Sequence, residues 1–224
     1  LDWPFMTERI EVGEAPLAPE LLRRLGERLA AGAIVVYPTE TVYGLGCDPC
    51  HQKAVRRLLA LKGRSRGHPL LLIVASEAAA RARVDLSDEA TARLWERLTR
   101  RLWPGPLTLV APARAVLPAP VRSAAGEVGV RLSSRPLARR LAHAVGGAIV
   151  ATSANRSGDR PPGTVGEILK VLGPGVDLLL DAGQAPGGTP STVLAITGGR
   201  PRLVREGAVP MEILASVIGR APSR

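Results

Sequence analysis

The sequence contains few aromatic residues and no long hydrophobic run. Phe, Trp and Tyr make up 3% of its 224 residues, whereas hydrophobic residues as a whole make up 46%. The core must therefore be built mainly from Leu, Val, Ile and Ala. No stretch approaches the ~20 apolar residues that a membrane-spanning helix needs. The segment 1–9 does not have the basic-then-apolar layout of a secretory signal, so we expect a cytoplasmic protein with no membrane segment.

Cysteine and histidine are also scarce, with two and three residues. Cys47, Cys50 and His51 match the C-x-x-C-H pattern of covalent haem attachment, but that chemistry needs an oxidising, exported setting. A zinc site would need about four ligands, and a thioredoxin-like redox pair has no supporting acidic or aromatic neighbours here. The pattern favours two structural thiols, and we expect no metal site in the chain.

The charge is strongly positive. The chain has 30 Lys and Arg against 20 Asp and Glu, a net charge of +10. Only Lys53, Lys62 and Lys170 are lysines, and the arginines are scattered along the chain without forming a block. Such a charge indicates an anionic partner, which can be a nucleic acid or a small polyanion such as ATP.

Strand-like and helical segments alternate along the chain. Short apolar runs predict strands over 33–37, 70–74, 107–111, 128–132, 148–151, 177–180, 192–196 and 202–204. Helical spacing predicts helices over 17–31, 52–61, 87–102, 135–145, 165–171 and 210–218. Thr164 and Glu167 have capping-box spacing. These patterns indicate an α/β fold with mixed strand directions. We expect one domain over 1–224, with a core at about 17–209 and frayed tails at both ends.

Three loops place polar residues beside expected strands, where ligands commonly bind in α/β sheets. The first, 38–46, holds two threonines and a glutamate before a glycine turn. The second, 62–69, is basic and glycine-rich, and its lysine and arginines suit phosphate or carboxylate oxygens. The third, 149–155, runs from an apolar strand into Ser153 and Asn155, which can orient phosphates or ribose.

Each of these loops also has a plainer interpretation, because such residues are common in turns and in solvated basic loops. The sequence contains no G-x-x-x-x-G-K-[ST] P-loop and no G-x-S-x-G elbow. Residues 44–49 begin like a dinucleotide fingerprint but lack its third small residue. If ATP binds, it binds without a Walker motif.

Four blocks of sequence together resemble one family. They are PTETVYGLG at 38–46, KGR at 62–64, WPGPLT at 103–108 and SAN at 153–155. Their order and spacing are similar to those of the YrdC-type L-threonylcarbamoyladenylate synthases, and the similarity extends from about Gly32 to Arg205. The resemblance implies a twisted mixed sheet flanked by helices, with a basic concave groove.

The resemblance also implies a reaction and its partners. L-threonine, bicarbonate or carbon dioxide, and ATP, usually with Mg²⁺, give threonylcarbamoyl-AMP and pyrophosphate. A separate transferase complex then uses the product to modify tRNA, and weak binding of tRNA or other RNA is also expected. No protein nucleophile is needed, since the threonine amine attacks carbon dioxide and the carbamate oxygen attacks the α-phosphorus of ATP. The site must gather anions and stabilise their charge.

The resemblance assigns the site residues in two groups. The catalytic set that holds the triphosphate is Lys62, Arg64, Ser153 and Asn155, with Arg66 and Arg205 as further ATP contacts. Arg131 matches the family arginine that meets the threonine carboxylate, and the other threonine contacts are Thr39, Ala151 and Ser191. Without the resemblance, Arg131 and Arg205 would be interpreted as surface ion pairs, which contribute little to stability.

The sequence departs from the family pattern at four positions: His68 replaces Lys or Asn, Ile73 replaces a His found in some members, Glu127 replaces Thr, and Pro190 replaces Glu. None of the four belongs to the catalytic set. The chain resembles the short form of the family, which lacks an extra C-terminal domain.

Two other functions fit parts of the sequence. A basic-groove module that binds double-stranded RNA or tRNA without catalysis would explain the +10 charge. It would not require a pocket of threonine and serine side chains. A carbamoyl-transfer domain of the hydrogenase-maturation type shares the expected fold, but such domains sit in longer chains with zinc-finger segments.

Overall fold

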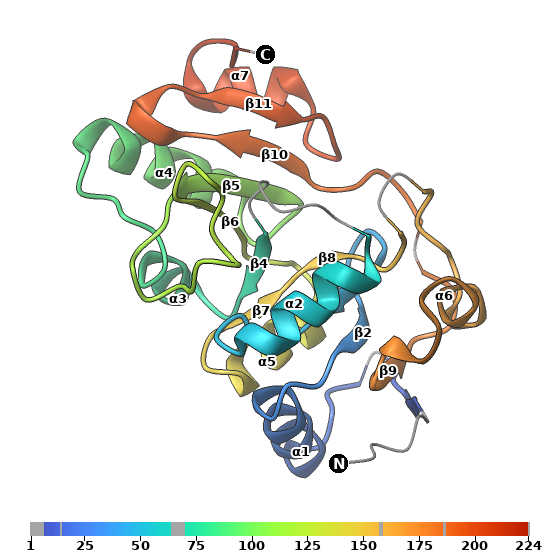
Figure 1. Cartoon of the computed structure of the whole chain (residues 1–224). Helices are drawn as coiled ribbons and strands as arrows, with labels where there is room; N and C mark the ends of the chain where they lie inside the picture. The colour runs from blue at the N-terminus through green and yellow to red at the C-terminus, as the bar shows by residue number, and fades with distance from the viewer. Residues whose placement is uncertain (1–6, 14, 64–69, 157–158, 186, 224) are drawn as a thin grey trace.

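The strands are divided between two mixed sheets, which are packed with helices (Figure 1). The computed structural model describes residues 7–13, 15–63, 70–156, 159–185 and 187–223. The strands are β1 (Glu8–Glu11), β2 (Val35–Pro38), β3 (Tyr43–Gly46), β4 (Leu71–Val74), β5 (Leu107–Pro112), β6 (Glu127–Arg131), β7 (Ala148–Val150), β8 (Thr152–Ser153), β9 (Leu178–Asp181), β10 (Thr192–Ala195) and β11 (Arg202–Arg205). The α-helices are α1 (Pro19–Ala30), α2 (Gln52–Leu61), α3 (Glu77–Arg81), α4 (Glu89–Leu102), α5 (Pro136–Ala144), α6 (Val165–Leu172) and α7 (Met211–Ile218).

The first sheet has the strand order β1-β9-β2-β3-β8. β9 is parallel to both β1 and β2, whereas β3 is antiparallel to β2 and β8. The register pairs Gly44 with Tyr37 on one side and with Ser153 on the other. The turn between β2 and β3, which carries Thr39, therefore lies close to Ser153 although more than a hundred residues separate them.

The second sheet has the order β11-β10-β5-β6-β4-β7. β5 and β10 are parallel, as are β4 and β6, and the other neighbours are antiparallel. Arg131 ends β6 opposite Ile73, and Ser191 immediately precedes β10. Most residues of these strands are buried, which explains why they appear in the sequence as continuous apolar runs.

The expected α/β class and the mixed strand directions are confirmed, although the strands form two sheets and the sequence suggested one. Most predicted strands and helices agree with the structure to within one or two residues. Four elements had no sequence signal that we recognised: β1, β3, β8 and α3. β3 is half glycine and β8 is two hydroxyl residues long, while three of the four residues of β1 are charged, so none of these strands shows an apolar run.

The helix ends follow ordinary capping chemistry. The capping box of α6 is present: the Glu167 backbone amide donates to Thr164 Oγ1, and the Glu167 carboxylate accepts from the Thr164 backbone amide. Asp88 caps α4 by accepting a hydrogen bond from the Thr91 amide at 2.8 Å. At the start of α2, His51 Nδ1 accepts from the Ala54 amide at 3.1 Å, so His51 serves as a helix cap.

The larger apolar cluster joins both sheets with α2, α4 and α7, and a second cluster lies between α1, α5 and the first sheet. Trp95 of α4 is fully buried in the larger cluster. Its ring packs edge-on against Trp103, with 5.2 Å between the ring centroids. In the part of the chain that the structure describes, no helix is both long and apolar enough to cross a bilayer.

The segment that follows α7 returns to the edge of the second sheet. The Leu203 amide donates to the Ser223 carbonyl at 2.7 Å, and the Ser223 amide donates to the Pro201 carbonyl at 3.0 Å. The outer edge of β11 is therefore covered at this point, a contact that sequence analysis did not anticipate.

Candidate active site

A cavity of about 590 Å³ is lined by residues of both sheets. The first sheet and its β2–β3 turn contribute Thr39, Thr41, Val42, Gly44, Thr152 and Ser153. The second sheet and its adjoining loops contribute Leu71, Leu72, Ile73, Thr108, Val110, Glu127, Arg131, Pro190, Ser191, Val193, Arg202, Val204 and Arg205. Ala151, between β7 and β8, and Pro161 complete the lining. The lining thus combines an apolar wall with hydroxyl and guanidinium groups, as is usual for small-molecule sites.

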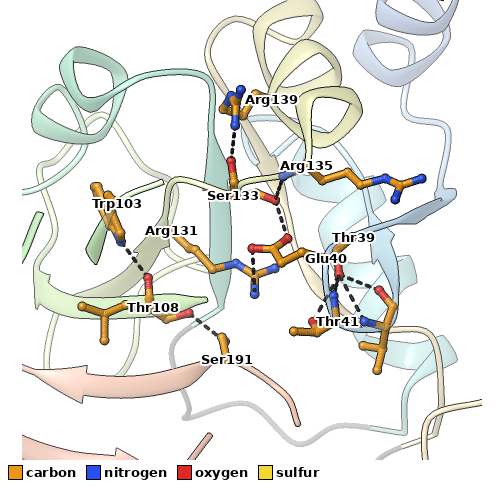
Figure 2. Close-up of polar contacts among 12 residues, drawn as sticks. Thr39, Glu40, Thr41, Trp103, Thr108, Arg131, Ser133, Arg135, Arg139 and Ser191 are labelled. Atoms are coloured by element: carbon orange, nitrogen blue, oxygen red, sulfur yellow. Dashed lines mark hydrogen bonds and ion pairs between the residues drawn. The ribbon is translucent and has the colours of Figure 1, made fainter. Parts of the chain in front are cut away.

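The β2–β3 turn is held by the Thr39 side chain. Thr39 Oγ1 donates to the Val42 carbonyl at 2.6 Å and accepts from the Thr41 and Val42 amides, both at 3.3 Å. Thr39 and Thr41 are both buried, and their hydroxyl oxygens are 3.3 Å apart. The two hydroxyls therefore have fixed positions at the cavity wall (Figure 2).

Arg131 reaches into the cavity from the end of β6, with 9% of its side chain exposed. Its guanidinium makes one ion pair, to Glu40, at 3.9 Å between Nη1 and Oε1, and among the described residues it donates no hydrogen bond. The backbone beyond it is fixed, because the Gly105 amide of the WPGPLT segment donates to the Leu132 carbonyl at 2.8 Å. A shielded guanidinium with unused donors is suited to bind a carboxylate or a phosphate.

Ser191, which precedes β10, is held from two sides. Its hydroxyl lies 3.0 Å from that of Thr108, and Arg205 donates to its carbonyl oxygen at 2.7 Å and to its hydroxyl at 3.1 Å. The backbone of Gly207 packs against this segment so closely that a Cβ there would come within 2.3 Å of the Pro190 carbonyl oxygen. Residue 207 therefore has to be glycine for Ser191 to keep its place.

Lys62 joins the end of α2 to the β8 segment. Its ammonium donates to the carbonyl oxygens of Ser153 at 2.6 Å and Asn155 at 2.8 Å, and more weakly to Asn155 Oδ1 at 3.4 Å. Ser153 lines the cavity, whereas Lys62 and Asn155 are buried directly behind it. The three predicted residues thus form one hydrogen-bonded unit beside the cavity.

The structure brings most of the predicted site residues together. The residues that line the same cavity are Thr39, Arg131, Ala151, Ser153, Ser191 and Arg205, and Lys62 and Asn155 adjoin it through Ser153. Arg64, Arg66 and His68 lie outside the described residues. Of the departures from the family pattern, Ile73, Glu127 and Pro190 all line the cavity, and Glu127 accepts a hydrogen bond from Thr197 Oγ1 at 2.6 Å.

Several polar residues in or beside the site received no role from the sequence, and three of them support other site residues: Thr108, Glu40 and Ser133. Thr108 is the last residue of WPGPLT and supports Ser191, so the motif itself was a signal for it. Glu40 lies in the PTET string and Ser133 two residues after Arg131, and neither position has a distinctive pattern of its own. The two side chains are joined by a hydrogen bond between residues that are 93 positions apart in the sequence.

The two cysteines are free and do not line the cavity. Burial raises the pKa of the Cys47 thiol to about 12, and partial burial with the Asp48 carboxylate also raises the pKa of Cys50. Both are therefore protonated near neutral pH, which makes them poor nucleophiles and poor metal ligands. Among the described residues, no group of three or more His, Cys, Asp or Glu side chains is arranged to hold a metal ion.

Together, the fold and the cavity define an α/β protein in which hydroxyl and guanidinium groups of two mixed sheets line one cavity. The sequence from 27 to 207 matches the Sua5_yciO_yrdC family model, which carries the description "Telomere recombination". A threonylcarbamoyl-AMP synthase from Halorhodospira halophila is 42% identical over 163 residues, covering 72% of this chain and 83% of the relative. The chain belongs to the Sua5/YciO/YrdC family.

Two solved structures have the same fold. Sua5 of P. abyssi, complexed with L-threonine, superposes with a TM-score of 0.88 at 32% identity over 97% of this chain. This chain spans 63% of that Sua5 chain. E. coli YciO superposes with a TM-score of 0.82 at 25% identity, over 93% of this chain and 100% of its own length.

Proposed function

We propose that this chain is a threonylcarbamoyl-AMP synthase that converts L-threonine, bicarbonate or carbon dioxide, and ATP into threonylcarbamoyl-AMP and pyrophosphate. The observation that carries the proposal is the shielded guanidinium of Arg131, which faces a cavity also lined by the hydroxyls of Thr39 and Ser191. A cation with unused donors beside two fixed hydroxyls matches the carboxylate and the hydroxyl of threonine. The names of the relatives support the same conclusion.

The threonine half of the site lies between the sheets. Arg131 binds the carboxylate, Thr39 and Ser191 provide hydroxyl contacts, and Ala151 and Ile73 give the apolar wall that accepts the methyl group. The hydrogen bonds that Arg205 donates to Ser191 support a role for Arg205 at the junction between the two substrates. Each side chain is held by neighbours before substrate arrives, so little ordering is needed on binding.

The ATP half comprises Lys62, Ser153, Asn155 and Arg205, with Arg64 and Arg66 from the loop outside the described residues. Ser153 offers its hydroxyl at the cavity, and Lys62 adds a positive charge directly behind it. Glu127 is the one carboxylate among the described lining residues, and its Oε1 accepts a hydrogen bond from Thr197. We therefore expect Mg²⁺ to enter with the ATP phosphates, whose charge it would neutralise.

The reaction requires the protein to position the substrates and does not require a protein nucleophile. The threonine nitrogen attacks the carbon of carbon dioxide and loses a proton, which forms an N–C bond and a carbamate. A carbamate oxygen then attacks the α-phosphorus, and the bond to the bridging oxygen breaks to release pyrophosphate. Arg131 holds the nucleophile in place, while the cationic residues stabilise charge on the phosphates.

The experiment that tests the proposal is a pyrophosphate-release assay with threonine, bicarbonate and ATP, together with mass spectrometry of the adenylate product. Pyrophosphate should appear only when all three substrates are present, and Arg131→Gln and Lys62→Ala should each lower turnover at least tenfold. Pyrophosphate release at the same rate without threonine would show that the proposal is wrong. RNA binding by a chain with no adenylate product would favour the non-catalytic RNA-binding module.

Further proposals depend on this one. We propose that the product is handed to a transferase complex that modifies tRNA, that the protein works in the cytoplasm, and that residues 1–224 form one domain with a basic concave groove. The net charge of +10 supports the groove and a weak affinity for RNA.

A further inference from the structure

A buried carboxylate lies beside Arg131 but outside the lining of the cavity. Glu40 follows Thr39 in the β2–β3 turn, and 14% of its side chain is exposed. Its Oε1 atom is buried without a hydrogen-bond donor among the described residues, and the same atom faces Nη1 of Arg131 at 3.9 Å. Figure 2 shows the Arg131 side chain extended toward Glu40 and the β2–β3 turn.

The second oxygen of Glu40 is anchored elsewhere. Ser133 Oγ donates to Oε2 at 2.5 Å, and the same Ser133 oxygen accepts from the Arg135 amide at 3.1 Å. Ser133 is fully buried, and its carbonyl oxygen accepts from Arg139 of α5. The carboxylate is therefore fixed by the start of α5, and its free oxygen is directed at the guanidinium (Figure 2).

The spacing of this pair leaves the donors of Arg131 available. At 3.9 Å the two charges attract each other, and the attraction is strong because little water separates them. The distance is too long for a hydrogen bond, so the pair consumes none of the guanidinium N–H groups. Glu40 thus restrains Arg131 while leaving its donors for a ligand in the cavity.

We propose that Glu40 is a positioning residue that acts through Arg131 and determines how tightly the site binds the carboxylate group of the amino acid. The inference rests on the proposed function, because it assumes that an amino acid carboxylate binds Arg131. Glu40 itself does not touch the substrate. Loss of its charge leaves a shielded guanidinium without its counter-ion, and Arg131 then no longer keeps the orientation that receives the substrate.

The test is a calorimetric comparison of wild type and Glu40→Gln with two ligands. L-Threonine carries the carboxylate, whereas L-threoninamide lacks it and keeps the amine and the side chain. We expect Glu40→Gln to weaken L-threonine binding about tenfold, the size of effect that one charge-assisted interaction supports. Binding of L-threoninamide and of ATP should change less than twofold.

Two further variants make the comparison specific. In an Arg131→Gln background, Glu40→Gln should have no additional effect on L-threonine binding, because the two residues act as one unit. The matched control is Glu8→Gln, which also removes a glutamate paired with arginines, Arg24 and Arg28, none of which lines the cavity. This control should leave L-threonine affinity unchanged.

The outcomes separate the two proposals. If the wild-type protein binds no L-threonine, the proposed function fails and the inference fails with it. If the wild type binds L-threonine and folded Glu40→Gln binds it equally well or more tightly, the inference alone is overturned. It is also overturned if Glu40→Gln lowers the affinity for L-threoninamide as much as the affinity for L-threonine. Should Glu40→Gln fail to fold, Ser133→Ala replaces it: removing the anchor should weaken L-threonine binding about threefold with no effect on L-threoninamide.

Discussion

At the scale of single residues, the site depends on cations that hold other site residues in place. The Lys62 ammonium is bonded to the carbonyl oxygens of Ser153 and Asn155, and Arg205 is bonded to Ser191. Each of these cations was predicted as a contact for ATP. The structure gives each of them a second task, which is to fix a hydroxyl at the cavity wall.

Lys62→Met tests this second task. The variant keeps the apolar stem but leaves two carbonyl oxygens behind the cavity without their donor. We expect a loss of about 2–3 kcal/mol in the free energy of unfolding, together with loss of pyrophosphate release. Denaturant titration measures the first effect. Lys53→Met, at an exposed position of the same helix, is the control and should change stability by less than about 0.5 kcal/mol. Equal stability of the two variants would contradict a structural role for Lys62.

Of the site residues that the sequence predicted, most line the cavity. The sequence did not predict some of the neighbouring residues that hold them in position. Thr39, Arg131 and Ser191 were recognisable because each matches a threonine contact of the family that the sequence resembles. Glu40 and Ser133 were not, because their contact depends on the packing of the β2–β3 turn against the start of α5. Such a tertiary contact has no local sequence pattern.

At the scale of elements, the strands and helices that the sequence predicted correctly are those with an apolar run, a helical spacing of apolar residues or a helix cap. The α2 helix was predicted to its last residue, and the Thr164 capping box was confirmed. β3 and β8 could not be predicted, since half of β3 is glycine, which has a low strand propensity, and β8 is only two residues long. These strands exist because they pair with their neighbours: Gly44 lies opposite Ser153 in the ladder. The first-sheet side of the cavity thus includes two strands with weak local signals.

The loop between β11 and α7 gives a prediction at this scale. Gly207→Ala places a methyl group within 2.3 Å of the Pro190 carbonyl oxygen and close to the Thr192 amide, so the loop must move away from Ser191. We expect a loss of about 2–3 kcal/mol in stability and a higher KM for threonine.

Gly166→Ala is the matched control for this change. Gly166 lies inside α6, and a Cβ there meets no atom within 4 Å. Alanine favours the helix, so this variant should gain up to about 1 kcal/mol in stability with an unchanged KM for threonine. A Gly207→Ala enzyme with wild-type KM would show that the loop does not position Ser191.

At the scale of the whole molecule, the cavity joins two sheets that share an apolar cluster but have separate hydrogen-bond ladders. A ligand that contacts Thr39 in one sheet and Arg131 in the other should stabilise both. With L-threonine at about 100 times its Kd, linkage predicts a gain of about 2.7 kcal/mol in the free energy of unfolding.

Amide hydrogen exchange can test this coupling. Addition of L-threonine should slow exchange in the β2–β3 turn and at Ser191–Val193 together, and it should leave the α1–α5 helix pair unchanged. Arg131→Gln should abolish both effects at once. Protection confined to one of the two sheets would contradict a ligand site shared between them.

The covered edge of β11 has a consequence for how copies of the protein behave in concentrated solution. An open strand edge presents unpaired amides and carbonyls that another chain can extend into a shared sheet, which is a common start of aggregation. The Leu203 amide at this edge already donates its hydrogen bond to the Ser223 carbonyl of the same chain. A second copy would first have to displace that segment. The strand that carries Arg205 to Ser191 is thereby protected from recruitment into an intermolecular sheet.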